Sequence, residues 1–227
     1  MTKIVIAIDG HSATGKSSTA KKVAEYLGYI YLDSGAMYRA TTLYFLRNNI
    51  KITDNLAVDK ALRKIVIEFK YNDYGLPSTY LNGEYVEDEI RSMAISGKVS
   101  EVSALKAVRI SMVDRQQLLG SNKGIVMDGR DIGSVVFPDA ELKIFMTATE
   151  KIRAQRRQKE LSQNGESISF EEVLENIIER DEKDSTRKES PLLKVKDALE
   201  VDNSEMTFED QVQKIINLAE SKIAELV

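Results

Sequence analysis

A glycine-rich stretch near the N-terminus, GHSATGKS from Gly10 to Ser17, has the spacing of a loop that binds nucleotide phosphates, G-x-x-x-x-G-K-[ST]. Glycines let consecutive backbone N–H groups turn toward phosphate oxygens, and a helix that begins directly afterwards adds the positive end of its dipole. Lys16 would bring a mobile positive charge to the outer phosphates, and the Ser17 hydroxyl is placed to hold Mg²⁺. The stretch therefore predicts binding of a nucleoside triphosphate with magnesium.

Two simpler interpretations of this stretch stay open. The glycines could form an ordinary turn, with Lys16 as a solvated cation. His11, the only histidine of the chain, could act as a base, but a spacer role suits a loop whose backbone binds the ligand. The flanking sequence favours the phosphate loop, because the apolar run Ile4–Ile8 predicts a buried strand before it and apolar spacing up to Leu27 predicts a helix after it.

Arginines follow several predicted strands or share the face of a predicted helix. Arg39 follows LDSGAMY, Arg109 ends SEVSALKAV and Arg130 lies in DGRD. Ligands of open α/β sheets bind beyond the carboxyl ends of the strands, so these positions suit an anion site, although each arginine could instead be a solvated surface residue. The other members of the set lie on two predicted helices: Arg153, Arg156, Arg157, Arg180 and Arg187.

An arginine-rich site suits an acceptor that is itself a phosphate monoester. The attacking oxygen of such an acceptor is already anionic near neutral pH, so no general base is needed. The barrier is repulsion between two polyanions, which bidentate guanidinium groups reduce while they stabilise the transferring phosphoryl group. A phosphate loop with many placed arginines, one histidine and no cysteine therefore predicts transfer from phosphate to phosphate.

Other classes of nucleotide-binding protein fit less well. A GTP switch needs Asn-Lys-x-Asp to read guanine, whereas Asn122-Lys123 is followed by Gly124 and Ile125. A hydrolytic ATPase would place an acid after an apolar run to orient water, and Asp128 has that position. Because Arg130 and Asp131 come two and three residues after it in DGRD, we expect a turn that contacts ligand instead.

The predicted elements alternate between strands and helices over most of the chain, which predicts an α/β fold with a core of parallel strands and helices on both faces. Ser169 with Glu172 three residues later forms a capping box that opens one of the helices. The expected strands are residues 4–8, 29–33, 124–129, 142–148 and 198–203, and the expected helices are residues 16–27, 36–47, 102–119, 150–163, the stretch from 169 onward and 207–226.

The stretch from Ile50 to Gly97 follows another pattern. IVIEFKYNDYG, PSTYL and EYVE read as short strands, with Asn82-Gly83 as a tight hairpin turn between the last two. We expect a small antiparallel sheet that is inserted as a separate subdomain.

Composition limits the partners of the chain. Its 227 residues can bury one core with small appended subdomains, and its net charge of −4 gives no general attraction to nucleic acid or anionic lipid. No apolar stretch is long enough to span a membrane, and cysteine is absent. We therefore expect a cytoplasmic protein that binds small anions and neither nucleic acid nor membrane. We also expect a monomer, although composition does not determine the oligomeric state.

Five motifs together resemble those of the bacterial cytidylate kinases, which are P-loop nucleoside monophosphate kinases. They are IDGxSxxGKS, YLDSGAMYR, VSEVSALKAVR, DGRDIGSVVFPDA and ERDEKDSTRKESPL, and the resemblance runs nearly end to end. It implies ATP-dependent phosphorylation of CMP and dCMP to CDP and dCDP, with Mg²⁺. It also implies a core of residues 1–49, 101–150 and 189–227, a monophosphate-binding insert of residues 50–100 and a helical lid of residues 151–188.

The resemblance also implies roles for individual residues. Direct roles in phosphoryl transfer fall to Lys16, Arg130, Arg153 and Arg187. ATP contacts fall to Gly10, His11, Ser12, Ala13, Thr14, Gly15, Lys16, Ser17, Ser18, Arg156 and Arg157, and the metal ligand is Ser17. The resemblance leaves open which residue orients Mg²⁺ besides Ser17, and Asp33 is one candidate. CMP contacts fall to Ser34, Arg39, Arg130 and Arg187 at the phosphate, to Ser100, Arg109 and Asp131 at the base, and to Arg180 and Asp184 at the sugar.

The implied contacts to the base make chemical sense. Asp131 can accept from the N4 amino group of cytosine while Arg109 donates to N3 or O2, whereas uracil would turn its O4 acceptor toward the carboxylate. Such a buried mismatch costs ~1–3 kcal/mol, which disfavours UMP without excluding it. Three alternatives stay open: an Arg109–Asp131 ion pair that only joins two segments, a different small phosphorylated acceptor, and an ATP-dependent binding module that is not a metabolic kinase.

Overall fold

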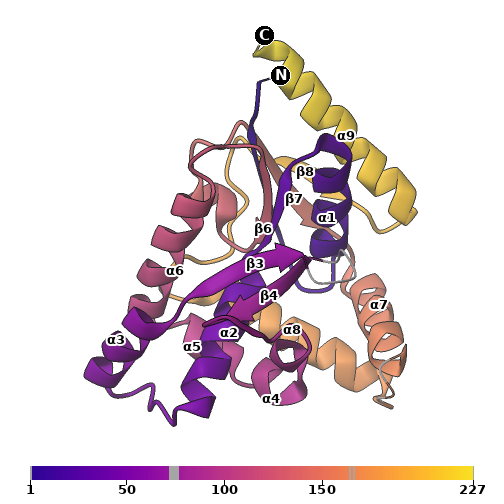
Figure 1. The fold of residues 1–227 in the computed structure, drawn as a ribbon. Helices are drawn as coiled ribbons and strands as arrows, with labels where there is room; N and C mark the ends of the chain where they lie inside the picture. The colour runs from indigo at the N-terminus through magenta and orange to yellow at the C-terminus, as the bar shows by residue number, and fades with distance from the viewer. Residues whose placement is uncertain (1, 72–76, 164, 166, 227) are drawn as a thin grey trace. The chain divides into compact units, whose positions relative to one another are not determined.

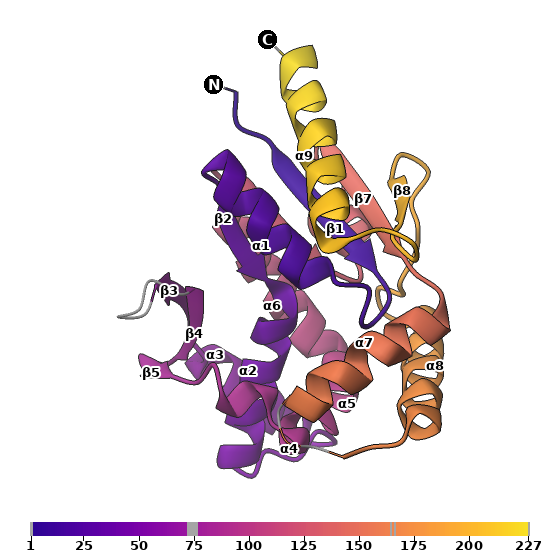
Figure 2. The same ribbon diagram turned by 90° about the vertical axis from the view of Figure 1, so that its right-hand side faces the viewer.

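The computed structural model describes residues 2–71, 77–163, 165 and 167–226 (Figures 1 and 2). These residues group into two compact units: Met1–Leu32 with Gly120–Val227, and Asp33–Leu119. We call them the sheet unit and the helical unit and describe each by itself. The division of the chain into core, insert and lid stays a prediction.

The sheet unit is built on five strands in the order β2-β6-β1-β7-β8. The pairs β1–β6, β1–β7 and β7–β8 are parallel. All six residues of β1 are buried, as expected for a parallel strand that is covered on both faces. The strands are β1 (Val5–Gly10), β2 (Ile30–Asp33), β6 (Ile125–Gly129), β7 (Leu142–Thr147) and β8 (Leu199–Asp202).

Two helices of the sheet unit, α1 (Lys16–Leu27) and α9 (Phe208–Glu225), lie side by side against the sheet (Figure 2). Val23 of α1 and Ile216 of α9 share a buried cluster with Ile6 of β1. Gly28 ends α1 in the left-handed conformation that glycine adopts most easily (φ 65°).

Two further helices of the sheet unit, α7 (Glu150–Gln163) and α8 (Phe170–Thr186), pack on each other through a small apolar cluster. The Ser169 side chain accepts a hydrogen bond from the Glu172 amide at 3.2 Å, so the predicted start of α8 is confirmed. A short π-helical segment (Ile132–Val136), not predicted from the sequence, follows β6 and contacts β1.

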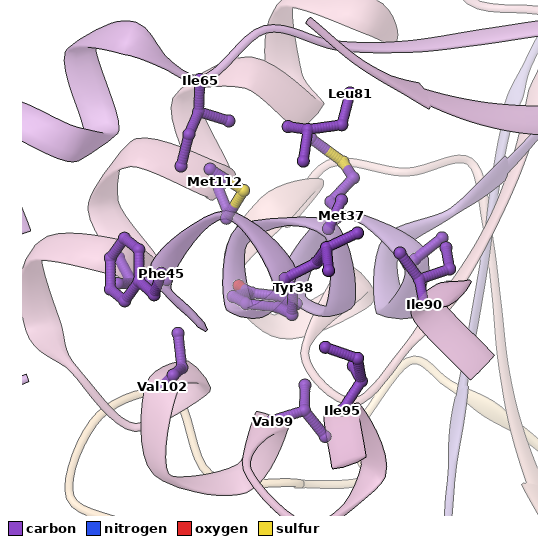
Figure 3. Packing of buried hydrophobic residues seen from close by; sticks show 14 of the residues in the cluster. Met37, Tyr38, Phe45, Ile65, Leu81, Ile90, Ile95, Val99, Val102 and Met112 are labelled. Carbon is purple, nitrogen blue, oxygen red and sulfur yellow. The ribbon is translucent and has the colours of Figure 1, made fainter. Parts of the chain in front are cut away.

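The helical unit holds the predicted antiparallel sheet, in the order β3-β4-β5, together with several helices. The hairpin turn at Asn82 (φ 51°) and Gly83 (φ 83°) is confirmed. Figure 3 shows its core, where Met37 and Tyr38 of α2 lie in one cluster with Met112 of α6. Its elements are α2 (Ser34–Arg47), α3 (Asn55–Lys64), β3 (Ile67–Tyr71), β4 (Pro77–Leu81), β5 (Glu84–Tyr85), a 3-10 turn (Glu89–Arg91), α4 (Met93–Ser96), α5 (Val99–Ser103) and α6 (Lys106–Leu119).

Three expectations for the helical unit were incomplete. Helix α3 was missed, although the Asp54 side chain caps it by accepting from the Ala57 amide at 3.0 Å. The single helix expected over 102–119 is two helices, α5 and α6, which are separated by Ala104 and Leu105. Helix α2 begins already at Ser34, because Asp33 caps it.

Two expected segments lie partly outside the described residues: the end of the first insert strand, at residues 72–75, and the connection between α7 and α8, at residues 164 and 166. The α/β class with a central parallel sheet and a small antiparallel sheet is confirmed. Among the described residues, no helix combines the length and the low polarity that crossing a bilayer requires.

Candidate functional site

The predicted phosphate loop lies between β1 and α1, as the motif requires. Gly10 has φ 149°, and a Cβ atom at this position would lie 2.1 Å from the Met146 carbonyl oxygen, so only glycine fits. Gly15 (φ 84°) caps α1, and Ala13 (φ 56°) also takes a left-handed conformation. The loop therefore depends on special backbone angles at three positions.

Lys16 is buried at the start of α1, with 5% of its surface exposed. Its Nζ donates to the His11 carbonyl at 2.6 Å and approaches Thr14 Oγ1 at 3.4 Å. Burial, followed by repulsion from Arg130, lowers the pKa of Lys16 to about 7. Such a cation is stabilised when an anionic ligand arrives.

Ser17 donates a hydrogen bond to Asp128 Oδ2 at 2.8 Å, and Tyr31 donates to the other oxygen of the same carboxylate at 2.9 Å. Sequence reasoning treated Asp128 only as a ligand contact of the turn and considered Asp33 as the second metal ligand. The signal for Asp128 was its place at the end of an apolar strand, which the sheet sets directly beside the strand that leads into the phosphate loop.

Asp9, directly before the loop, links it to the turn that carries Arg130 and Asp131. The Asp9 carboxylate accepts from the amides of Ile132 at 2.8 Å and Gly133 at 2.7 Å. Burial raises the pKa of Asp9 to about 6, although both hydrogen bonds act in the opposite direction. Sequence reasoning gave Asp9 no role.

Asp184 of α8 brings two predicted phosphate-binding arginines together. Arg130 Nε donates to Asp184 Oδ2 at 2.8 Å, and Arg187 Nη1 lies 3.8 Å from Asp184 Oδ1. Arg187 Nη2 also lies 3.7 Å from Asp131 Oδ1. Burial alone would raise the pKa of Asp184, but the charge of Arg130 and then that of Arg180 hold it below its usual value. The described geometry thus unites Arg130, Asp131, Asp184 and Arg187.

Arg153 of α7 is nearly fully buried beside the phosphate loop. It donates from Nε to the Ala148 carbonyl at 3.0 Å and from Nη1 to the Ser12 carbonyl at 3.3 Å, and it forms an ion pair with Asp181. The same Asp181 carboxylate accepts from the Ser12 amide at 3.3 Å and lies 3.4 Å from His11 Nδ1. Asp181, which sequence reasoning missed, therefore joins α8 to the loop.

The remaining residues expected at ATP have different surroundings. Arg156 donates to Asn203, whereas Arg157 pairs with Glu160 of the same helix at 2.9 Å. Thr14 is fully buried, and Ser18 is exposed at the start of α1. Arg180 is exposed on α8, close enough to Lys16 to lower its pKa.

The helical unit carries the other part of the predicted CMP site. Arg39 donates from Nη2 to Asp33 Oδ2 at 3.0 Å, and Arg91 Nη2 lies 3.4 Å from the same oxygen. The buried Nε of Arg39 has no hydrogen-bond partner among the described residues, which suits an incoming anion. Ser34, next to Asp33, is buried at the first position of α2.

Arg109 is buried in the helical unit, with 3% of its surface exposed. It donates from Nη1 to the Ser103 carbonyl at 3.2 Å, and its guanidinium carbon lies 5.2 Å from the centre of the Tyr38 ring. Ser100 lies in α5, one turn before Ser103. Because Asp131 belongs to the sheet unit, the joint reading of a base by Arg109 and Asp131 stays a prediction.

Comparison with known proteins gives a consistent result over nearly the whole chain. The family model described as cytidylate kinase matches residues 6–221. The cytidylate kinase of Flavobacterium psychrophilum is 52% identical over 222 residues, which cover 96% of this chain and 98% of that protein. The cytidylate kinase of Bacteroides thetaiotaomicron is 56% identical over 215 residues, which cover 93% of this chain and 94% of that protein.

A solved structure of an uncharacterized protein from Eubacterium ventriosum is similar with a TM-score of 0.53, over 97% of this chain and 99% of that one. At 12% identity this similarity supports the fold alone. The sequence matches, by contrast, identify the family. The motifs that resemble this family lie in the segments described above, which carry the phosphate loop, the arginines and the carboxylates. The chain belongs to the cytidylate kinase family.

Proposed function

We propose that this nucleoside monophosphate kinase transfers the γ-phosphoryl group of ATP to CMP, and to dCMP, giving ADP and the cytidine diphosphate. The observation that carries the proposal is the geometry of the phosphate loop, where Gly10 has no room for a Cβ atom and Lys16 is buried at the start of α1 with its Nζ 2.6 Å from the His11 carbonyl oxygen. Burial lowers the pKa of Lys16, and bound polyanionic phosphates would favour its charged form.

The phosphate loop would hold the triphosphate through its backbone N–H groups and Lys16. Ser17 and Asp128 offer a hydroxyl and a carboxylate oxygen, the hard donors that Mg²⁺ prefers, and Mg²⁺ bound with phosphates needs only one or two protein ligands. When bound, the ion would neutralise charge on the ATP oxygens. Ser17 and Asp128 are therefore the residues that we expect to hold it.

Transfer would require no general base, because the attacking CMP phosphate oxygen is already anionic near neutral pH. Arg39, Arg130 and Arg187 would bind that phosphate, and Arg153, which already contacts the Ser12 carbonyl, would face the transferring group from the lid. The in-line displacement forms a bond from the CMP oxygen to the γ-phosphorus while the bond from that phosphorus to the β,γ-bridging oxygen breaks, leaving ADP.

Cytosine would be read by Asp131, which accepts from N4, and by Arg109, which donates to N3 or O2, with Ser100 beside them. Both charged side chains are almost fully buried, so a base with the wrong pattern of donors and acceptors leaves a buried group unsatisfied. This supports selection of cytosine over uracil.

Chromatographic measurement of CDP and ADP formed from CMP, ATP and Mg²⁺ tests the proposal. We expect equal amounts of the two products and little ADP without acceptor. ADP formed without CDP would overturn the proposal in favour of hydrolysis.

A further inference from the structure

Asn203, in the turn between β8 and α9, is fully buried and makes contacts in three directions. Its Nδ2 donates to the Thr14 carbonyl of the phosphate loop at 2.8 Å and to Gln211 Oε1 at 2.5 Å. Its Oδ1 and its backbone carbonyl accept from Arg156 Nη1 and Nη2, both at 2.9 Å. One side chain thus joins the loop, α7 and α9.

The contacts of Arg156 are not those expected of a guanidinium group whose donors are available to a phosphate. Its acceptors within the described part of the chain are neutral oxygen atoms, two from Asn203 and one, at a marginal 3.5 Å, from Thr14. Two parallel hydrogen bonds to one residue hold a guanidinium in a fixed orientation. Arg157 next to it is tied only to a partner on its own helix, Glu160.

The hydrogen bonds around Asn203 run in one direction toward the base of α1. Gln211 Nε2 donates to Thr19 Oγ1 at 2.7 Å, and Thr19 Oγ1 donates to the Gly15 carbonyl at 2.9 Å. Since Gln211 must donate to Thr19 with its amide nitrogen, its oxygen faces Asn203, which requires the Asn203 amide group to be a donor there. The network therefore suits asparagine and not aspartate.

The peptide geometry connects this network to ATP. In a trans peptide the C=O and the following N–H point in opposite directions. Holding the Thr14 carbonyl toward Asn203 therefore turns the Gly15 N–H away from Asn203 and fixes its direction, and N–H groups of this loop are the ones proposed to bind phosphate.

We propose that Asn203 is a positioning residue of the ATP site, and that Arg156 acts by holding Asn203 and not as a direct phosphate ligand. The inference rests on the proposed function only in that the loop binds ATP. Arg156→Ala and Asn203→Ala then disturb the same hydrogen-bond network, so their effects on the free energy of ATP binding are not additive.

A double-mutant cycle tests this, with the ATP dissociation constant measured by calorimetry without any acceptor. We expect each single substitution to weaken ATP binding about tenfold, as for one lost hydrogen bond to a charged group, and the double variant to be no weaker than the weaker single variant. Independent effects would instead weaken ATP binding about a hundredfold in the double variant. That result would make Arg156 a direct phosphate ligand and overturn the proposal.

The controls separate positioning from general damage. When Arg157→Ala is combined with Asn203→Ala, the fold-losses in ATP affinity of the two single variants should multiply. Lys159→Ala, which removes an exposed cation on α7, should leave ATP affinity unchanged. The KM for ATP should rise in the Arg156 and Asn203 variants while the KM for CMP stays within about twofold, whereas equal rises would indicate a merely structural role.

If Asn203→Ala does not fold, Gln211→Ala replaces it in the cycle with the same expectation. ATP binding is measured without CMP. A protein that binds ATP but does not phosphorylate CMP would therefore refute the proposed function, whereas the double-mutant cycle alone decides the inference about Asn203 and Arg156.

Discussion

Arg130 donates from Nε to the Asp184 carboxylate at 2.8 Å, although the two residues lie on different elements, the turn after β6 and helix α8. Both side chains are mostly buried, so the pair fixes where the guanidinium group can present its remaining N–H donors. Asp184 was expected to contact the sugar, and this geometry gives it a second task in orienting Arg130.

Asp184→Asn should therefore lower kcat/KM for CMP by roughly 10- to 100-fold, because a hydrogen bond between charged groups contributes about 1.5–3 kcal/mol. ATP affinity should change by less than about twofold. Steady-state kinetics with each substrate varied gives the comparison, and Glu182→Gln, an exposed carboxylate on the same helix, is the matched control. Equal losses for ATP and CMP would contradict the role given to Asp184.

Arg109→Met and Asp131→Ala should weaken the use of CMP at least tenfold and leave ATP binding nearly unchanged, because each removes one of the two buried side chains that are proposed to bind the base. Asp131→Ala should also lower the ratio of kcat/KM for CMP to kcat/KM for UMP. Kinetics with both nucleotides measures this, with Lys106→Met, an exposed cation on the same helix as Arg109, as control. An unchanged CMP:UMP ratio in Asp131→Ala would refute the reading of N4.

Asp128→Asn should raise the Mg²⁺ concentration needed for half-maximal activity by about tenfold, since an amide oxygen is a weaker ligand than a carboxylate. The introduced amide can still accept a hydrogen bond from Ser17 or Tyr31 through its oxygen, so the local structure should persist. Magnesium titrations of the wild type, this variant and the exposed-acid control Asp139→Asn give the answer. An unchanged magnesium requirement in Asp128→Asn would place the ion elsewhere.

Asp9 should give the folded state a pH dependence of a defined sign. Burial raises its pKa from 3.8 to about 6, so between these values the folded state holds the proton more tightly than the unfolded chain. The contribution of Asp9 to stability is fully present below pH ~4 and is lost as the pH rises through 6. The shift corresponds to about 3 kcal/mol.

Urea unfolding of the wild type and of Asp9→Asn between pH 4 and pH 7 measures this contribution. The stability of the wild type relative to the variant should fall by up to about 3 kcal/mol as the pH rises. A relative stability that rises with pH would mean that the two amide hydrogen bonds outweigh burial.

Much of the fold could be predicted, because buried parallel strands and capped helices leave local signals. The apolar runs before Asp9 and Asp128 and the cap at Ser169 are confirmed as elements. Helix α3 was missed because the whole stretch was interpreted as strands, although Asp54 and the spacing of Val58, Ala61 and Leu62 are helical signals. The break before α6 falls at Ala104 and Leu105, where the apolar spacing of Val102, Leu105 and Val108 continues without interruption, so periodicity cannot register it.

The candidate site was predicted less completely, for a physical reason. Motifs reveal groups that are proposed to bind the ligand, such as Lys16 and Arg130, because ligand chemistry restricts their type and spacing. Asp9, Asp181 and Asn203 act on other protein groups, often more than a hundred residues away in the chain, and only the folded structure brings those partners together. The base-reading pair and the residues that would hold Mg²⁺ remain predictions.

The most direct test of the central claim is ADP release from ATP and Mg²⁺ by the purified protein with CMP, dCMP, UMP, AMP or no acceptor. We expect strong turnover with CMP and dCMP, weak turnover with UMP and almost none without acceptor. ADP release that does not depend on the acceptor, or no release with any nucleotide, would contradict phosphoryl transfer to CMP and leave only the phosphate loop as a proposed ATP-binding element.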